Sequence, residues 1–267
     1  MGESIRIGAL ISGGGTNLQA IIDACEDGRI DGTMVFVGSD QPNVKGLERA
    51  RNHTIPSFVV EYGPLVRAYR QAPQSFALPD DFDLNTILAK QHLFPGDTPE
   101  TRVQEFFCTR AAAENQLLEK INAFGPVDLL VLAGFMRNLT PYFIDRFNVA
   151  PDSPRIMNIH PALLPSFPGV DGYGDTFRYG CKVGGCTVHF IDYGEDSGPI
   201  IGQRSFPIDE TDTLDDVKRK GLEQEWLLYP ECIQHFARNR IQTVNMTHTL
   251  DNGHVYRRTV VKIAQHQ

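Results

Sequence analysis

The chain lacks an excess of basic residues. Among its 267 residues, 25 Lys and Arg stand against 33 Asp and Glu, which gives a formal net charge of −8 at pH 7. Binding along a phosphate backbone usually requires a basic surface, so we expect no nucleic-acid partner. An apolar run long enough to cross a bilayer is also absent, and the first residues lead directly into an expected strand. We therefore expect neither a membrane span nor a signal peptide.

Cysteines are few and irregularly spaced. Five are present, at positions 25, 108, 181, 186 and 232. An odd number cannot form a fully paired disulfide framework, and Cys181 and Cys186 are too far apart for a Cys-x-x-Cys motif. No His pair follows at zinc-finger spacing. The sequence therefore predicts reduced thiols in a cytoplasmic protein, and we expect no metal site.

Short apolar runs alternate with helical patterns along the chain. The expected strands lie at 5–11, 33–38, 57–60, 128–133, 156–160, 186–191 and 200–206, and the expected helices include 102–124 and 213–236. This alternation predicts an α/β fold with a doubly wound, mostly parallel sheet. The tail from 241 to 263 alternates polar and apolar residues around Asp251-Asn252-Gly253, which predicts a C-terminal β-hairpin.

The periodicity fades between about 63 and 105. Five prolines and an acidic patch at 80–83 fall there, and one short helix is expected from Leu84 to His92. We interpret this stretch as an insertion in a single domain, 1–240, which the hairpin tail, 241–267, follows. An insertion of this length is either a flap over a site, a disordered segment or surface decoration, and we favour surface decoration.

A glycine-rich loop follows the first expected strand. Gly13-Gly14-Gly15 precedes Thr16 and Asn17, and an apolar helix start follows. This arrangement offers backbone N–H groups and a positive helix end to an anion, so it predicts a phosphate site. It is not a Walker A loop, and Leu18 stands where a Rossmann fingerprint has its third glycine. The alternative is a plain turn in which Thr16 or Asn17 caps the helix.

Two polar side chains, Asn158 and His160, share one face of an expected strand end. A turn rich in acids, 192–199, lies further along the chain and contains Asp196. An amide can stabilise a developing negative charge, an imidazole can move a proton, and a carboxylate can orient the imidazole. No serine or cysteine is placed as a nucleophile, because Ser166 lies between prolines. The set therefore suits acyl transfer to a nucleophile that the substrate brings, although a structural role for His160 is the alternative.

The motifs together resemble the folate-dependent formyltransferases. The resemblance rests on residues 158–165 (Asn-Ile-His-Pro-Ala-Leu-Leu-Pro), on 196–201 (Asp-Ser-Gly-Pro-Ile-Ile) and on the loop at 11–21. It extends from about Ile5 to Phe236, interrupted by the insertion. It implies a Rossmann-like formyltransferase fold and transfer of a formyl group from 10-formyltetrahydrofolate to the amine of glycinamide ribonucleotide, in purine biosynthesis. A homodimer is an open alternative to a monomer.

The resemblance also implies residue roles. Asn158, His160 and Asp196 would stabilise the tetrahedral intermediate and move protons, without a metal. Substrate-binding roles would fall to Gly15, Thr16 and Asn17 for the phosphate, to Glu225 for the ribonucleotide, and for the folate to Arg110, Met136, Arg137, Asn138, Leu139 and Asp192.

Some features depart from the family pattern or allow other interpretations. Asp171-Gly172-Tyr173 replaces a His-x-His stretch in a loop, 169–175, that we expect to be mobile. The departure and the insertion keep a different amine, such as a sugar nucleotide, as the alternative acceptor, whereas the acidic charge argues against methionyl-tRNA. Asp40 after the second strand could instead bind the ribose of a nicotinamide cofactor. We expect His189 to be a satisfied strand histidine, and Met136 could be core filler.

Overall fold

A seven-stranded sheet forms the centre of the computed structural model, which describes residues 4–148, 150 and 153–264. The strands are β1 (Ile5–Ile11), β2 (Gly32–Ser39), β3 (Ser57–Val59), β4 (Leu129–Leu132), β5 (Ile156–His160), β6 (Val183–Phe190) and β7 (Ile200–Pro207), in the order β3-β2-β1-β4-β5-β6-β7. The first five pair in parallel, and β6 is antiparallel to both neighbours. The predicted mostly parallel sheet is confirmed.

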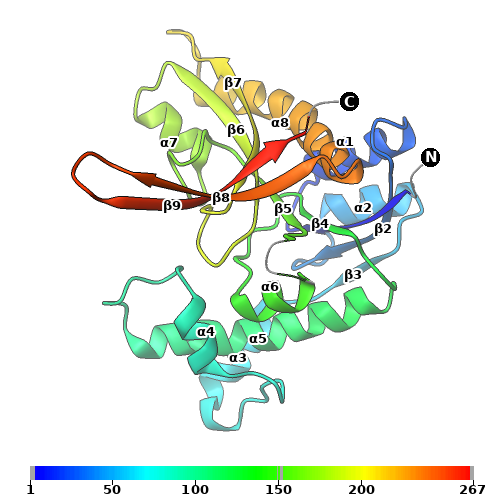
Figure 1. The fold of residues 1–267 in the computed structure, drawn as a ribbon. Helices are drawn as coiled ribbons and strands as arrows, with labels where there is room; N and C mark the ends of the chain where they lie inside the picture. The colour runs from blue at the N-terminus through cyan, green and yellow to red at the C-terminus, as the bar shows by residue number, and fades with distance from the viewer. Residues whose placement is uncertain (1–3, 149, 151–152, 265–267) are drawn as a thin grey trace.

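Helices cover both faces of this sheet (Figure 1). On one face lie α1 (Thr16–Glu26), α2 (Lys45–Asn52) and α8 (Leu214–Ala237), and on the other lie α3 (Tyr62–Gln71), α5 (Glu100–Asn122) and α6 (Pro141–Phe147). Alternate residues of β1 point to opposite faces of the sheet. Ala9 and Ile11 pack on the face covered by α1, α2 and α8, and Leu10 packs on the face covered by α3, α5 and α6. Burial on both faces explains why these strands read as continuous apolar runs.

The stretch from 63 to 105 packs against the body of the protein. It contains most of α3, a 3₁₀ turn (Pro73–Ser75), α4 (Leu84–Lys90) and the start of α5. Aromatic and aliphatic side chains from α4, α5 and α6 form a separate cluster that includes Ile87, Phe107 and Tyr142. The expected short helix is present, although it ends at Lys90 because Gln91 is extended. This packing favours a surface layer over a disordered segment.

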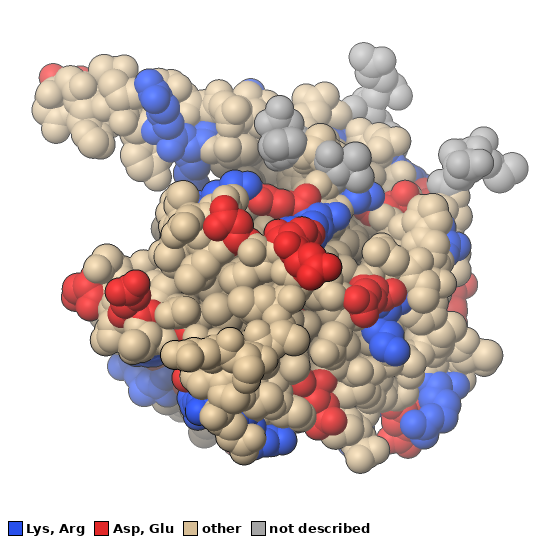
Figure 2. Space-filling view, turned by 90° about the horizontal axis from the view of Figure 1, so that it is seen from below, with Lys and Arg blue, Asp and Glu red and all other residues tan. Residues whose placement is uncertain are grey.

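The C-terminal residues form the predicted hairpin. β8 (Ile241–Thr249) pairs antiparallel with β9 (Val255–Ile263), and both strands project from the body as an arm (Figures 1 and 2). Arg258 Nη2 donates to the carbonyl of Ser197 at 3.1 Å, so the arm contacts the acidic turn after β6. Residues 265–267 of the predicted tail lie outside the described residues.

The expectation of a loop is wrong for 172–175, because α7 (Gly172–Arg178) begins there; residues 169–171 precede this helix. Asp171 supports this helix by accepting a bond from Arg178 Nη2 at 2.7 Å. Position 172 requires glycine, because a Cβ there would lie only 2.6 Å from the carbonyl oxygen of Pro161. The glycine here thus allows a close approach of two backbone segments and does not mark a loop.

Within the described ranges, no helix combines the length and apolarity of a membrane span. In Figure 2, acidic and basic side chains are interspersed over the face seen from below.

Candidate active site

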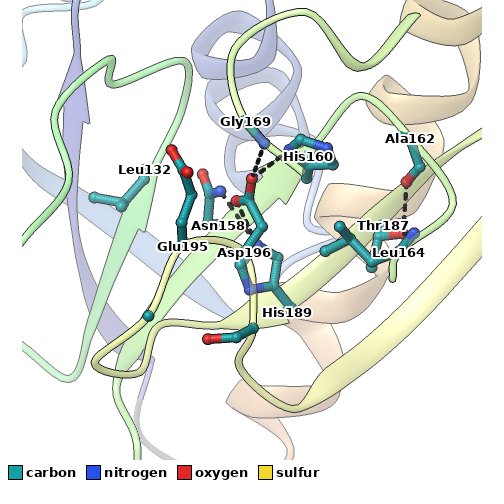
Figure 3. Close-up of polar contacts among 12 residues, drawn as sticks. Leu132, Asn158, His160, Ala162, Leu164, Gly169, Thr187, His189, Glu195 and Asp196 are labelled. Atoms are coloured by element: carbon teal, nitrogen blue, oxygen red, sulfur yellow. Dashed lines mark hydrogen bonds and ion pairs between the residues drawn. The ribbon is translucent and has the colours of Figure 1, made fainter. Parts of the chain in front are cut away.

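Asn158, His160 and Asp196 converge at the carboxyl end of β5 (Figure 3). His160 Nδ1 lies 3.1 Å from Asp196 Oδ2, and the same carboxylate oxygen accepts the backbone N–H of Gly169 at 2.8 Å. Asp196 reaches this place from the turn between β6 and β7, where its backbone is left-handed with φ of 50°. Asn158 and His160 come from β5 and Asp196 from this turn, and the contact between His160 and Asp196 is direct.

The backbone after His160 is held by β6. Thr187 Oγ1 donates to the carbonyl of Ala162 at 2.7 Å and accepts the N–H of Leu164 at 3.0 Å. Thr187 is fully buried. This bracing explains why the proline-rich exit from β5 keeps His160 at the strand end.

His189 and the carbonyl of Phe167 are two members of the site that the sequence analysis missed. His189 Nδ1 lies 2.9 Å from the carbonyl of Phe190, so that nitrogen carries the hydrogen and Nε2 accepts from Asn158 Nδ2 at 3.2 Å. His189 is a buried strand histidine, as expected, but it orients the Asn158 amide. The Phe167 carbonyl lies 2.8 Å from His160 Nε2, which must therefore carry a hydrogen.

Burial and charge act in opposite directions on the two titratable groups. Burial lowers the pKa of His160 below its usual value, although the Asp196 carboxylate and the Phe167 carbonyl oppose this by stabilising the imidazolium. Burial also disfavours ionisation of Asp196, but His160 and the Gly169 N–H oppose it, and the pKa of Asp196 is lowered. The structure thus pairs an ionised carboxylate with a histidine whose imidazolium form loses its proton more readily than usual.

The glycine loop reaches the same site from β1. Gly15 is left-handed with φ of 68° and is the N-cap of α1, so the capping role suggested for Thr16 or Asn17 is wrong. A Cβ on Gly15 would lie 2.7 Å from the Cα of Gly46 in α2. The first turn of a helix leaves backbone N–H groups without intrahelical partners, and here that turn faces the site. Asn17 and Glu225 meet there, since Asn17 Nδ2 donates to Glu225 Oε2 at 2.6 Å.

A cavity of about 230 Å³ joins these groups. Its lining includes Asn17, Asn158, His160, Asp196 and Glu225, and on the other side Met136, Arg137, Asn138 and Leu139. Met136 is 59% exposed, so it is not core filler. Leu139 is buried, and Asn138 Nδ2 lies 3.4 Å from Glu195 Oε1.

Arg110 lies beside this cavity, in a second one of about 680 Å³ that shares Arg137, Asn138 and Glu195 with the first. Its guanidinium stacks 4.7 Å from the ring centre of Tyr62 and 4.8 Å from that of Phe106. The insertion contributes further arginines to the lining of the second cavity, namely Arg67, Arg70 and Arg102.

Comparisons with known proteins agree with this arrangement. Residues 5–233 match the family described as formyl transferase. The chain belongs to the formyl transferase family. The phosphoribosylglycinamide formyltransferase of Escherichia coli (strain K12) is 32% identical over 238 residues, 89% of this chain and 90% of the relative. The solved glycinamide ribonucleotide transformylase 1 from Symbiobacterium toebii has a TM-score of 0.69 and 36% identity, and the match covers 99% of this chain and 96% of that one.

Asp40, after β2, is held in an ion pair within this formyl transferase. Its carboxylate is buried and accepts from Arg137 Nε at 2.6 Å. An acid that binds a cofactor ribose must be accessible to it, so this ion pair counts against the nicotinamide interpretation. Asp40 instead holds a residue of the formyl transferase cavity in place.

Asp192 does not line the cavity of this formyl transferase, contrary to the sequence analysis. Its carboxylate accepts from Ser197 Oγ at 2.6 Å and from the Gly194 N–H at 3.1 Å. These local bonds turn Asp192 away from the cavity, so it stabilises the turn that carries Asp196.

One group in the described part of this formyl transferase could hold a cation, namely Asp23, Glu26 and His53. None of the three lines the cavity. Its members already have partners, since Glu26 Oε1 lies 2.7 Å from His53 Nδ1 and Asp23 Oδ1 accepts from Gln19 Nε2 at 2.8 Å.

Proposed function

We propose that this formyl transferase moves the formyl group of 10-formyltetrahydrofolate to the amine of glycinamide ribonucleotide. The observation that carries the proposal is the shared cavity, which Asn158, His160 and Asp196 line together with Asn17 from the start of α1. Relatives that share about a third of their residues with this chain over most of their length are phosphoribosylglycinamide formyltransferases. Five free thiols suit a reducing compartment, so we place the reaction in the cytoplasm.

The residues of the site divide the work of formyl transfer. The acceptor amine attacks the formyl carbon, a new C–N bond forms, and the bond to the folate nitrogen breaks. One N–H of Asn158 is occupied by His189, and the other can donate to the oxyanion that develops. His160 Nε2 already carries a hydrogen, so Nδ1 is the nitrogen that takes a proton from the attacking amine and returns one to the leaving nitrogen. Asp196, 3.1 Å from Nδ1, stabilises the imidazolium between these steps.

The acceptor lies between the glycine loop and Glu225. The N–H groups of Gly15, Thr16 and Asn17 at the start of α1 favour a phosphate, because the helix dipole adds positive potential there. Glu225 lines the cavity with an oxygen that can accept from ribose hydroxyls.

The donor lies against Met136, Arg137, Asn138 and Leu139. Its anionic glutamate end extends towards Arg110, which is stacked between two aromatic rings and therefore held in one orientation. The cationic lining of the second cavity favours this direction.

Formyl transfer with purified protein tests the proposal. Wild-type protein should convert glycinamide ribonucleotide and 10-formyltetrahydrofolate to the formylated product, and His160→Ala should lose about two to four orders of magnitude in rate while it stays folded. A competition between glycinamide ribonucleotide and an amino sugar nucleotide in one reaction reports the acceptor. Preference for the sugar nucleotide, or full activity of the His160 variant, would contradict the proposal.

A further inference from the structure

Glu225 is a buried carboxylate with a donor on each oxygen. Asn17 Nδ2 donates to Oε2 and Tyr173 Oη donates to Oε1, both at 2.6 Å. Glu225 is 4% exposed and still lines the site cavity, whereas Tyr173 is absent from that lining and lies behind it. Glu225 is thus held from two sides, by α1 and by α7.

Tyr173 is fixed by close packing. Its ring lies so near α8 that a Cβ on Gly221 would be 2.1 Å from Tyr173 Cζ, and Phe206 meets the ring edge-on at 6.1 Å. Gly221 precedes Glu225 by one helical turn, so the ring lies against the same face of α8 that carries the carboxylate.

The start of α7 adds a second constraint. Position 174 requires glycine with Asp171 in this conformation, because a Cβ there would lie 2.1 Å from Asp171 Oδ2. Thr176 Oγ1 also donates to the Gly172 carbonyl at 2.7 Å. Asp171, the two glycines and Tyr173 therefore act together. The segment that departs from the family pattern places one hydroxyl on Glu225.

Two fixed donors determine the plane of the carboxylate. Each carboxylate oxygen can accept two hydrogen bonds, and each of these two uses one on a protein donor. One acceptor position remains on each oxygen, and Glu225 lines the cavity. We propose that Tyr173 is a positioning residue that holds the Glu225 carboxylate in the plane needed to accept two hydroxyl groups of the acceptor substrate. This inference rests on the proposed role of Glu225 in acceptor binding.

The protonation of Glu225 depends on the same contacts. Burial raises the pKa of Glu225, and the Asn17 and Tyr173 donors oppose that rise. The other titratable groups that its charge affects are Cys186 on β6 and Tyr229 on α8, whose pKa values are raised mainly by burial. His160 and Asp196 line the same cavity. Loss of the Tyr173 hydroxyl should therefore raise the pKa of Glu225 further.

The variant Tyr173→Phe tests the proposal, because it removes the hydroxyl and keeps the ring that packs on Gly221. We expect the KM for glycinamide ribonucleotide to rise about tenfold, with kcat and the donor KM within about twofold, as for the loss of one hydrogen bond used in ground-state binding. The acidic limb of kcat/KM for the acceptor should move to higher pH. Tyr256→Phe, on the exposed hairpin, is the matched control.

A double-mutant cycle separates positioning from general destabilisation. Glu225→Gln should raise the acceptor KM by itself, and adding Tyr173→Phe should then have little further effect, because the hydroxyl acts through the carboxylate. An unchanged acceptor KM in Tyr173→Phe, an equal rise in the donor KM, or additive effects in the cycle would overturn the inference. Wild-type protein that does not formylate glycinamide ribonucleotide would instead refute the proposed function.

Discussion

Replacing Asp196 by Asn tests how far this carboxylate controls His160. The substitution keeps the shape of the side chain and removes a charge that lies 3.1 Å from His160 Nδ1. Opposite charges at that distance attract by about 5 kcal/mol at an effective dielectric constant of about 20. Desolvation offsets part of this, and hydrogen bonds to charged groups contribute about 1.5–3 kcal/mol net.

A net contribution of this size corresponds to about one to two pKa units. Burial already lowers the pKa of His160, and Asp196 opposes that shift. Without the carboxylate the pKa of His160 should fall further, so the acidic limb of the kcat profile should move to lower pH. The imidazolium then forms less readily during transfer, and kcat should fall about 10- to 100-fold.

Initial rates of tetrahydrofolate formation between pH 5 and 9 measure both effects. Asp209→Asn is the matched control, because Asp209 forms an exposed ion pair with Lys220 and does not line the cavity. A kcat for Asp196→Asn within twofold of wild type, or an acidic limb that moves to higher pH, would refute the reasoning.

Other predictions concern packing and stability. Gly46→Ala places a Cβ 2.3 Å from Ile11 Cδ1, so it should displace the glycine loop and raise the acceptor KM severalfold, whereas Gly96→Ala, with open space around it, should not. Burial raises the pKa of Glu114 from its usual 4.5 to about 7, so its contribution to stability is complete below the lower value and is lost as pH rises through the higher one. Glu114→Gln should remove this loss of stability, which amounts to about 3 kcal/mol by pH 8. Urea unfolding of both proteins at pH 5 and pH 8 measures the difference, and equal pH dependence in the two would contradict the prediction. Hydrogen bonds from Thr213 lower the pKa of Asp216 to about 2. Its contribution to the free energy of unfolding is therefore present above its usual pKa and is lost as pH falls through the lowered pKa. Urea midpoints measured from pH 5 to 2 should show this loss in the wild type and not in Asp216→Asn.

Much of the fold could be predicted because local patterns report it directly. The apolar runs at β1, β4 and β5 are continuous because helices cover both faces. Thr140-Pro141 is a typical helix start, and it begins α6 with Thr140 as the N-cap. α3 was missed, because six of its ten residues are exposed and only Tyr62 and Tyr69 are buried, so few apolar positions mark it.

The site could be predicted only where a motif is contiguous. Asn158 and His160 share a strand face, which is a matter of spacing along the chain. His189 is a polar residue within the apolar strand β6, which is a signal in the sequence. Its partner Asn158 follows only from the register of β5 and β6. The Phe167 carbonyl left no signal in the sequence, because any residue supplies a backbone carbonyl.

The sequence by itself determined the alternation of strands and helices, the glycine loop at the start of α1 and the residues that end β5, because these depend on local spacing and backbone conformation. Only the tertiary structure decided that Asp196 contacts His160 directly, that Asp40 pairs with Arg137 and that Tyr173 donates to Glu225. These pairs join residues 36, 97 and 52 positions apart. Their contact depends on how the sheet and its helices pack, which no local pattern encodes.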